Sequence, residues 1–340
     1  MKRTVIIAEA GVNHNGSMQN AFKLIDAAKE AGADYVKFQT FKANKLVSKS
    51  AKKAEYQSAN MKTADDSQFE MLKKLELSEQ EHYELKEYAE KSGIKFLSTG
   101  FDEESIDFLD QLGIDFFKIP SGEITNYPYL KHIASKGKPI IISTGMTTLG
   151  EIEAVVNLFT SNGIPLKDIQ ILHCNTEYPT PMKDVNLRAM KTIEAAFGVD
   201  VGYSDHTIGI EIPIAAVAMG AKVIEKHFTL DKAMEGPDHK ASLDPSELKS
   251  MISAIRNIEL AMSGSGHKQP SESEYKNMQV ARKSIHIKGP LTKGTILSEE
   301  HLIMLRPGNG ISPFDMDKLM GLKLNKDLEV NHQLSWSDLS

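Results

Sequence analysis

Short runs of β-branched and aromatic residues alternate with stretches of helical periodicity along most of this chain, and that alternation limits the folds available to it. Eight such runs predict strands, at 4–10, 34–40, 95–99, 115–121, 139–144, 169–174, 199–204 and 221–228. Apolar residues recur at helical spacing between them, for example at 17–31, 78–92, 126–136, 148–162 and 209–219. Several predicted helices end at a glycine just before the next strand, as in "EKSGIKF".

Eight successive strand–helix units favour a closed parallel sheet, the (β/α)8 TIM barrel of the α/β class. A doubly wound open sheet is the alternative, but it usually has fewer strands and a glycine-rich phosphate loop. No G-x-G-x-x-G pattern follows the first predicted strand. We therefore expect a TIM barrel over residues 1–262.

The pattern changes after the barrel. Residues 263–280 are rich in serine, glycine and charge and predict a linker. Residues 281–340 predict a small β-rich domain with a weak internal repeat, since "LTKGTILSEEHL" resembles "LNKDLEVNHQLSWSDL". A domain of this size is marginally stable alone, so we expect it to dock against another surface.

Composition excludes several classes of protein. The 340 residues carry a formal net charge of −6, which gives no support for a nucleic-acid partner. Cys174 is the only cysteine, so no intrachain disulfide can form and a reducing, cytoplasmic compartment is expected. The first apolar run is broken at Glu9, too early for a signal peptide, and no run approaches the length of a membrane span.

Polar or charged residues occupy the predicted carboxyl end of every strand, where barrels of this kind carry their chemistry. His206 and His227 end two neighbouring strands, close enough for two imidazoles to share a divalent cation that also binds substrate. One such histidine is more often an ordinary hydrogen-bonding residue, but two beside Asp205 and the later "GPDH" make a metal site an equal alternative. Asp238, in that motif, could be a third ligand or bind a hydroxyl.

A second set of strand-end residues suits an anion. Lys37 and Lys118 stand between apolar neighbours, in "VKF" and "FKI", where a solvated surface lysine is less expected. Together with the hydroxyls of Thr99, Ser121, Ser143 and Ser204 they suit a phosphate or a carboxylate.

Two glutamates and the cysteine leave alternatives open. Glu123, in "PSGEIT", is a candidate acid–base carboxylate or an ordinary glutamate at a helix N-terminus. Glu9 could bind a hydroxyl or simply face the barrel interior. Cys174 is expected to pack rather than act as a nucleophile, because no base–thiol pattern accompanies it.

An ordered set of motifs resembles the N-acetylneuraminate (sialic acid) synthase family, which includes legionaminic acid synthases. The motifs cover nearly the whole chain: "AEAGVNHNG", "VKFQTFKA", "KIPSGEITNYPYL", "IISTGM", "LHCNTEYPTP", "GYSDHT", "IEKHFT", "GPDHKAS" and "RPGNGISP". The resemblance includes residues 281–340, which are similar to the antifreeze-like (SAF) domain of that family. Gly100, where the family commonly has proline, and the "CNTEYP" order are departures.

The resemblance implies an enzyme that condenses phosphoenolpyruvate with an open-chain 2-acetamido sugar and releases phosphate. It implies a divalent metal, Mn²⁺ or Mg²⁺, on His206 and His227, and a catalytic role for Glu123. Positions matching the phosphoenolpyruvate site are Lys37, Thr99, Lys118, Ser121, Ser143, Asn175, Thr176 and Ser204. Positions matching the sugar and the reacting centre are Glu9, Gln39, Tyr178 and Asp238.

The resemblance also implies a domain-swapped homodimer, in which Arg306 reaches the barrel of the other subunit and binds the N-acyl group of the sugar. It places the loop at 54–68 near the substrates. The sugar is either N-acetylmannosamine or 2,4-diacetamido-2,4,6-trideoxymannose. Two rival functions remain: an aldolase that uses a Schiff-base lysine on the same barrel, and a non-enzymatic carbohydrate-binding module.

Overall fold

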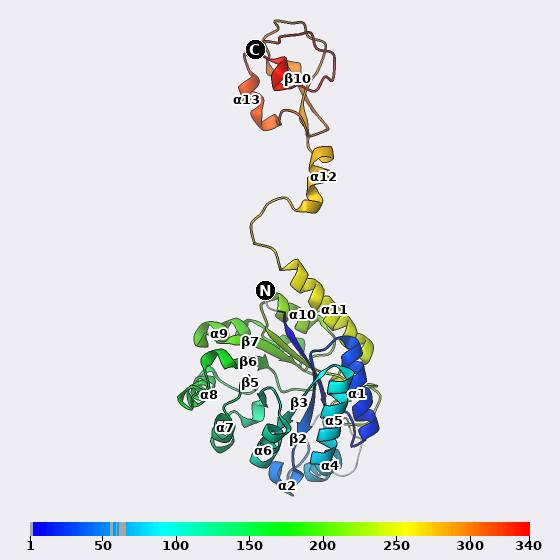
Figure 1. Cartoon of the computed structure of the whole chain (residues 1–340), viewed down its shortest axis with the longest axis vertical. Helices are drawn as coiled ribbons and strands as arrows, with labels where there is room; N and C mark the ends of the chain where they lie inside the picture. The colour runs from blue at the N-terminus through cyan, green and yellow to red at the C-terminus, as the bar shows by residue number, and fades with distance from the viewer. Residues whose placement is uncertain (1–2, 55–56, 59, 61–65) are drawn as a thin grey trace. The chain divides into compact units, whose positions relative to one another are not determined.

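The computed structural model describes residues 3–54, 57–58, 60 and 66–340, which form two compact units, Met1–Ser263 and Gly264–Ser340 (Figure 1). The first unit is built on one sheet of eight parallel strands. The strands are β1 (Val5–Gly11), β2 (Tyr35–Thr40), β3 (Lys95–Gly100), β4 (Phe117–Ile119), β5 (Ile140–Ser143), β6 (Ile169–Cys174), β7 (Asp200–Asp205) and β8 (Val223–His227). Each lies within a residue or two of a run that the sequence predicts.

The hydrogen-bonded order of the sheet is β3-β2-β1-β8-β7-β6-β5-β4. Its two end strands, β3 and β4, contact each other, so the sheet closes on itself. The predicted TIM barrel is therefore confirmed. Sequential strands are neighbours except at the β1–β8 pair, which joins the start of the barrel to its last strand.

Helices surround the strands (Figure 1). They are α1 (Met18–Ala31), α2 (Ala43–Leu46), α4 (Gln68–Leu75), α5 (Glu79–Ser92), α6 (Glu103–Leu112), α7 (Tyr127–Ala134), α8 (Leu149–Ser161), α9 (Arg188–Phe197), α10 (Glu211–Ala218) and α11 (Pro245–Ala261). The glycines that predict helix ends behave as expected: Gly32 and Gly93 follow α1 and α5 with φ of 87° and 77°, which only glycine adopts without strain. Among the described residues, every helix is too short or too polar to traverse a bilayer.

The strand registers decide which side chains share the barrel interior. Glu9 of β1 is paired with Lys37 of β2 on one side and with His227 of β8 on the other. Ser204 of β7 is paired with Glu225 of β8. Because side chains alternate along a strand, residues paired in this way point to the same face. The polar residues therefore meet inside the barrel, while the intervening isoleucines, valines and phenylalanines pack in the core beneath the helices.

The second unit contains an antiparallel pair, β9 (Ser284–Ile287) and β10 (Leu302–Leu305), with α12 (Glu272–Ala281) and α13 (Met316–Leu319). Helix α12 lies, except for its last residue, in the stretch predicted as a linker, and it begins at a capping box between Ser271 and Glu274. A compact apolar cluster fills the unit, with Ile285, Ile287 and Leu334 fully buried.

The weak sequence repeat corresponds to two similar half-structures that pair with each other. Leu291 and Leu328 occupy equivalent places and exchange backbone hydrogen bonds of 2.9 and 2.8 Å. Each half ends in one turn of 3₁₀ helix that begins after a serine, Ser298 in the first half and Ser335 in the second. The repeat therefore reflects two segments that complete one small core together.

Asp338 anchors the second of these turns and predicts how the small unit responds to acid. Its carboxylate is 1% exposed, accepts a hydrogen bond from the Ser335 N–H (2.9 Å) and pairs with Lys326 (2.6 Å) and His332 (3.0 Å). Burial alone would raise the pKa of this carboxyl, but Lys326 and the Ser335 N–H hold the pKa well below its usual range. The stability that the carboxylate contributes is present above the unfolded-state pKa, about 3.9, and is lost as the pH falls.

We expect Asp338→Asn to destabilise the second unit by about 1.5–3 kcal/mol at pH 7, the range for hydrogen bonds to a charged group. Trp336, the only tryptophan of the chain, lies in the same turn, so urea unfolding followed by its fluorescence reports this unit within the full chain. The gap between the free energies of unfolding of variant and wild type should narrow progressively as the pH falls below about 4. Asp315→Asn, which removes a surface ion pair with Lys318, should change the midpoint little; equal effects of the two variants would contradict the prediction.

Candidate active site

A cavity of about 240 Å³ opens at the carboxyl ends of the barrel strands, and each of the eight strands contributes to its lining. The structure brings together thirteen of the residues predicted from the sequence. They are Glu9, Lys37, Gln39, Thr99, Lys118, Ser121, Ser143, Thr176, Tyr178, Ser204, His206, His227 and Asp238. The cavity thus gathers both predicted sets, the histidines and the lysines with their hydroxyls.

The Lys37 ammonium at the base of this cavity is already engaged by protein groups. It lies 2.7 Å from Glu9 Oε2 and 3.5 Å from Glu225 Oε2, and it donates to Thr99 Oγ1 at 3.0 Å. The Thr99 hydroxyl accepts a hydrogen bond from it, and the two carboxylate oxygens lie within ion-pair distance. Lys37 is therefore surrounded by acceptors of the protein itself and contributes mainly positive charge to the cavity.

Lys118 differs from Lys37 in having donors to spare. Among the described residues its one carboxylate partner is Glu225, at 3.3 Å, although its side chain is 3% exposed. Burial lowers the pKa of this ammonium, and Glu225 opposes that effect. Ser143, which also lines the cavity, has a buried Oγ with no hydrogen-bond partner in the described part of the chain. An ammonium with free protons beside an unpaired hydroxyl suits an anionic oxygen of a ligand.

Glu225 is a site residue that the predictions missed. It links the two lysines and accepts a hydrogen bond from Ser204 Oγ at 3.0 Å. Burial alone raises the pKa of this carboxyl, but Lys118 and Lys37 lower it below its ordinary value, so Glu225 stays ionised. The signal was present in the sequence: Glu225 stands two residues before His227, and alternate residues of a strand share a face.

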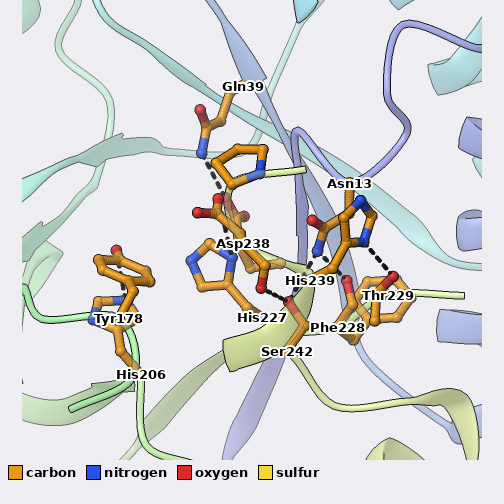
Figure 2. A network of polar contacts seen from close by, with 12 residues as sticks. Asn13, Gln39, Tyr178, His206, His227, Phe228, Thr229, Asp238, His239 and Ser242 are labelled. Atoms are coloured by element: carbon orange, nitrogen blue, oxygen red, sulfur yellow. Dashed lines mark hydrogen bonds and ion pairs between the residues drawn. The ribbon is translucent and has the colours of Figure 1, made fainter. Parts of the chain in front are cut away.

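His206 and His227 lie side by side with ring centroids 5.4 Å apart (Figure 2). His206 Nδ1 faces the carbonyl oxygen of Asn175, which can only accept, so Nδ1 carries the proton and Nε2 keeps its lone pair, 3.0 Å from the Tyr178 hydroxyl. His227 Nδ1 is buried without a hydrogen-bond partner in the described residues and lies 3.9 Å from Asp238 Oδ2. Burial lowers the pKa of His206 to about 4 and that of His227 as well, which keeps both rings neutral.

Two neutral imidazoles fit a divalent cation that retains open coordination positions. The buried, unpaired Nδ1 of His227 supports this, because a buried polar atom without a partner is costly unless a ligand satisfies it. The described residues contain no group of three or more histidine, cysteine or acidic side chains arranged to hold a metal. The pair therefore does not resemble a closed structural metal site.

Asp205 does not join the cavity, although it directly precedes His206. Its carboxylate lies 2.5 Å from the Lys226 ammonium, and both side chains are 0% exposed. Asp205 also accepts hydrogen bonds from the N–H (3.1 Å) and the hydroxyl (3.0 Å) of Thr207. Since neighbouring residues of a strand face opposite sides, the inward position of Ser204 and His206 places Asp205 on the outside of the barrel.

Two predicted residues of the barrel, Glu123 and Asn175, are not part of the cavity lining, and a third, Arg306, belongs to the second unit. Glu123 accepts a hydrogen bond from Asn126 Nδ2 at 2.6 Å, although Ser121 and Gly122 of the same turn do line the cavity. Asn175 turns its side chain to the Glu177 N–H (2.8 Å) and contacts His206 through its backbone carbonyl. Arg306, in the second unit, donates from Nε to the carbonyl of Ala281 at 3.0 Å.

One wall of the cavity is apolar and was not predicted. It is formed by Val12, Met71, Leu72, Leu75 and Phe101. Helix α4 supplies three of these side chains, and the apolar spacing in "QFEMLKKL" was the available signal. Of the predicted loop 54–68, Gln57 lines the cavity and Asn60 Nδ2 donates to the Pro237 carbonyl at 2.7 Å; positions 55–56, 59 and 61–65 lie outside the described residues.

Comparison with known proteins identifies the family of this chain. The profile of the NeuB family matches residues 24–268, and the profile of the SAF domain matches residues 282–340. This chain belongs to the NeuB family. The predicted resemblance is therefore confirmed, and so is the small β-rich domain as a SAF domain.

Two curated relatives of this NeuB-family chain are described as N,N'-diacetyllegionaminic acid synthases. The protein from Campylobacter jejuni is 56% identical over 323 residues, covering 94% of this chain and 96% of the relative. The protein from Legionella pneumophila is 52% identical over 336 residues, covering 98% and 94%. The crystal structure of an N-acetylneuraminic acid synthetase from Leptospira borgpetersenii, with citrate, superimposes with a TM-score of 0.71 at 34% identity, covering 82% of this chain and 90% of that one. The chain is therefore an enzyme of this synthase family.

Proposed function

We propose that this NeuB-family enzyme condenses phosphoenolpyruvate with open-chain 2,4-diacetamido-2,4,6-trideoxymannose, releasing phosphate and forming N,N'-diacetyllegionaminic acid. The choice of sugar follows the two relatives at 52% and 56% identity. N-acetylmannosamine is the alternative substrate. The observation that carries the reaction type is the Lys118 ammonium, with free donors, in the same cavity as two neutral imidazoles.

In this proposal the anionic groups of phosphoenolpyruvate lie at the base of the cavity. Lys118 and the unpaired Ser143 hydroxyl bind them directly, with hydroxyls of Thr99, Ser121, Thr176 and Ser204 around them. Lys37 adds positive charge while remaining bound to Glu9 and Glu225. Preorganised donors in a buried site stabilise charge that develops during the reaction, because they need no rearrangement.

His206 and His227 would hold the divalent cation, Mn²⁺ or Mg²⁺, and a cation bound there would polarise the aldehyde oxygen of the sugar. The enol carbon of phosphoenolpyruvate forms a bond to the aldehyde carbon, and the positive charge that develops at C2 is quenched by water. The C2–O bond to phosphate then breaks, and inorganic phosphate leaves. Gln39, Tyr178 and Asp238 line the part of the cavity beside the histidines and are proposed to contact the sugar.

Glu123 is proposed to orient the attacking water or to accept its proton, from the turn that brings Ser121 and Gly122 into the cavity. We expect Glu123→Gln to lower kcat by about 10²–10⁴, the usual contribution of a positioned acid–base group. The variant should keep its metal affinity, measured by the electron paramagnetic resonance of Mn²⁺. Asn126→Ala, which removes the hydrogen-bond partner of Glu123, is the milder companion variant. Unchanged turnover of Glu123→Gln would remove Glu123 from this role.

The proposed function is tested by phosphate release from phosphoenolpyruvate and Mn²⁺ with each of the two acetamido sugars, with and without chelator. We expect release that depends on sugar and metal, and a higher kcat/KM with the trideoxy sugar. Borohydride trapping of a lysine adduct with pyruvate would instead support the Schiff-base aldolase. Binding of sugar without phosphate release would support a carbohydrate-binding module.

The quaternary arrangement belongs to the same proposal. We propose a homodimer in which Arg306 from one subunit completes the sugar site in the other. Arg306→Ala should then raise the KM for the sugar, and mixing it with a barrel-inactive variant should restore activity by forming one intact composite site.

A further inference from the structure

Two loops at the mouth of the barrel, far apart in sequence, are tied together by one buried side chain. Asn13, in the loop after β1, is 0% exposed and does not line the cavity. Its Nδ2 donates to the carbonyl of Phe228 at 2.8 Å and to Ser242 Oγ at 3.0 Å (Figure 2). Phe228 directly follows His227. One amide group therefore bridges the end of β8 and the loop that returns from it.

The second of these hydrogen bonds leads to Asp238. Ser242 Oγ accepts from Asn13 and donates its own proton to the backbone carbonyl of Asp238 at 2.7 Å. This chain of hydrogen bonds from Asn13 through Ser242 thus fixes the backbone of Asp238, whose side chain lines the cavity. The hydrogen bond from Asn13 to the Phe228 carbonyl fixes the backbone next to His227.

The carboxylate of Asp238 has no comparable support of its own. Within the described residues no hydrogen bond reaches its side chain, and its nearest charged or titratable partner is His227 Nδ1 at 3.9 Å. The residue is 7% exposed and faces the cavity. Its place opposite His227 is consequently decided by how the loop backbone is held.

A second set of contacts holds the same loop at its other end. His239 is 0% exposed and bonds Thr229 Oγ1 through Nδ1 (2.7 Å) and Asn15 Oδ1 through Nε2 (3.1 Å). Asn15 Nδ2 donates to the Glu235 carbonyl at 2.9 Å. A Cβ on Gly236 would lie 2.6 Å from the His239 ring, so any larger residue there would displace that ring. Asn15 of "NHNG" and His239 of "GPDH" therefore hydrogen-bond to each other and hold the two loops together.

We propose that Asn13 is a positioning residue: by bridging Phe228 and Ser242 it sets the place of the Asp238 carboxylate opposite His227, where that carboxylate binds a hydroxyl of the amino sugar. This inference rests on the proposed function. It assigns no contact between Asn13 and either substrate. Its effect should therefore appear in the handling of the sugar and not in the binding of phosphoenolpyruvate, whose proposed anchors, Lys118 and Ser143, lie on other strands.

The test is Asn13→Ala in the full chain, with steady-state kinetics for both substrates. We expect kcat/KM for the amino sugar to fall at least tenfold, with the KM for phosphoenolpyruvate within twofold of wild type. The rise in melting temperature caused by phosphoenolpyruvate, measured in chelator without turnover, should also be unchanged. In an Asp238→Asn background, Asn13→Ala should cost less than a further twofold, because the group it positions is already impaired.

The matched control is Thr4→Val. Thr4 immediately precedes β1, at the end of the strand opposite to Asn13, and the substitution removes its buried hydrogen bond to the Ala221 carbonyl. It should lower the melting temperature without changing kcat/KM for one substrate more than for the other. If Asn13→Ala does not fold, Ser242→Ala removes the other half of the bridge and should show the same split. The proposal is overturned if Asn13→Ala lowers kcat/KM equally for both substrates. It is also overturned if the loss in the double variant equals the product of the losses in Asn13→Ala and Asp238→Asn. Failure of the wild-type enzyme to release phosphate with any sugar would instead defeat the proposed function.

Discussion

Lys118→Met is expected to lower kcat/KM for phosphoenolpyruvate by about 10³ while leaving the barrel folded. Lys118 has one carboxylate partner in the described part of the chain and lines the cavity beside the unpaired Ser143 hydroxyl. Removing a preorganised donor from a buried site costs about 10²–10³ in rate, and the lost ammonium also weakens binding of the anion. Glu225 keeps its contacts with Lys37 and Ser204, so its buried charge stays compensated in the variant.

The measurement is steady-state kinetics with phosphoenolpyruvate varied, together with circular dichroism to verify the fold. Lys37→Met is the informative contrast, because it leaves Glu9 without its 2.7 Å partner and weakens the compensation of Glu225. That variant should lose stability as well as activity. A Lys118→Met enzyme with a near-normal KM for phosphoenolpyruvate would show that the anion binds elsewhere.

Lys226→Met is expected to destabilise the barrel by about 3–5 kcal/mol, the cost of removing one partner from a fully buried ion pair. Lys226 and Asp205 are both 0% exposed and 2.5 Å apart, and Lys226 also donates to the Thr207 carbonyl. The variant leaves the Asp205 charge buried without its counterion. Asp205 precedes His206 and Lys226 precedes His227, so loss of the pair should also disturb the spacing of the two rings.

Urea unfolding followed by circular dichroism measures this loss. Adding Asp205→Asn to Lys226→Met should recover a large part of it, because no uncompensated charge remains and the asparagine can still bond to Thr207. Lys86→Met, which removes a surface pair with Glu90 on α5, should change the free energy of unfolding by less than about 1 kcal/mol. Similar effects of Lys226→Met and Lys86→Met would show that the buried pair contributes little.

The sequence by itself determined the architecture and much of the site. The spacing of apolar residues in strands and helices, and glycines such as Gly93 at helix ends, depend only on residues close in sequence. The eight strands and their order along the chain could therefore be predicted directly. Once a barrel is predicted, the carboxyl ends of its strands must lie at the same end of the barrel. This placed His206, His227, Lys37 and Lys118 together. The same alternation applied to strand β8 would have added Glu225.

Only the tertiary structure decided which partner each of these groups has. Lys37 and Lys118 look alike in sequence, yet strand register surrounds one with acceptors and leaves the other with free donors. Asn13 and Ser242 meet across 229 positions because β1 and β8 close the barrel. Local propensity carries no information about such pairings, since they depend on closure and register. The shape of the cavity and the support of Asp238 therefore could not be read from the chain alone.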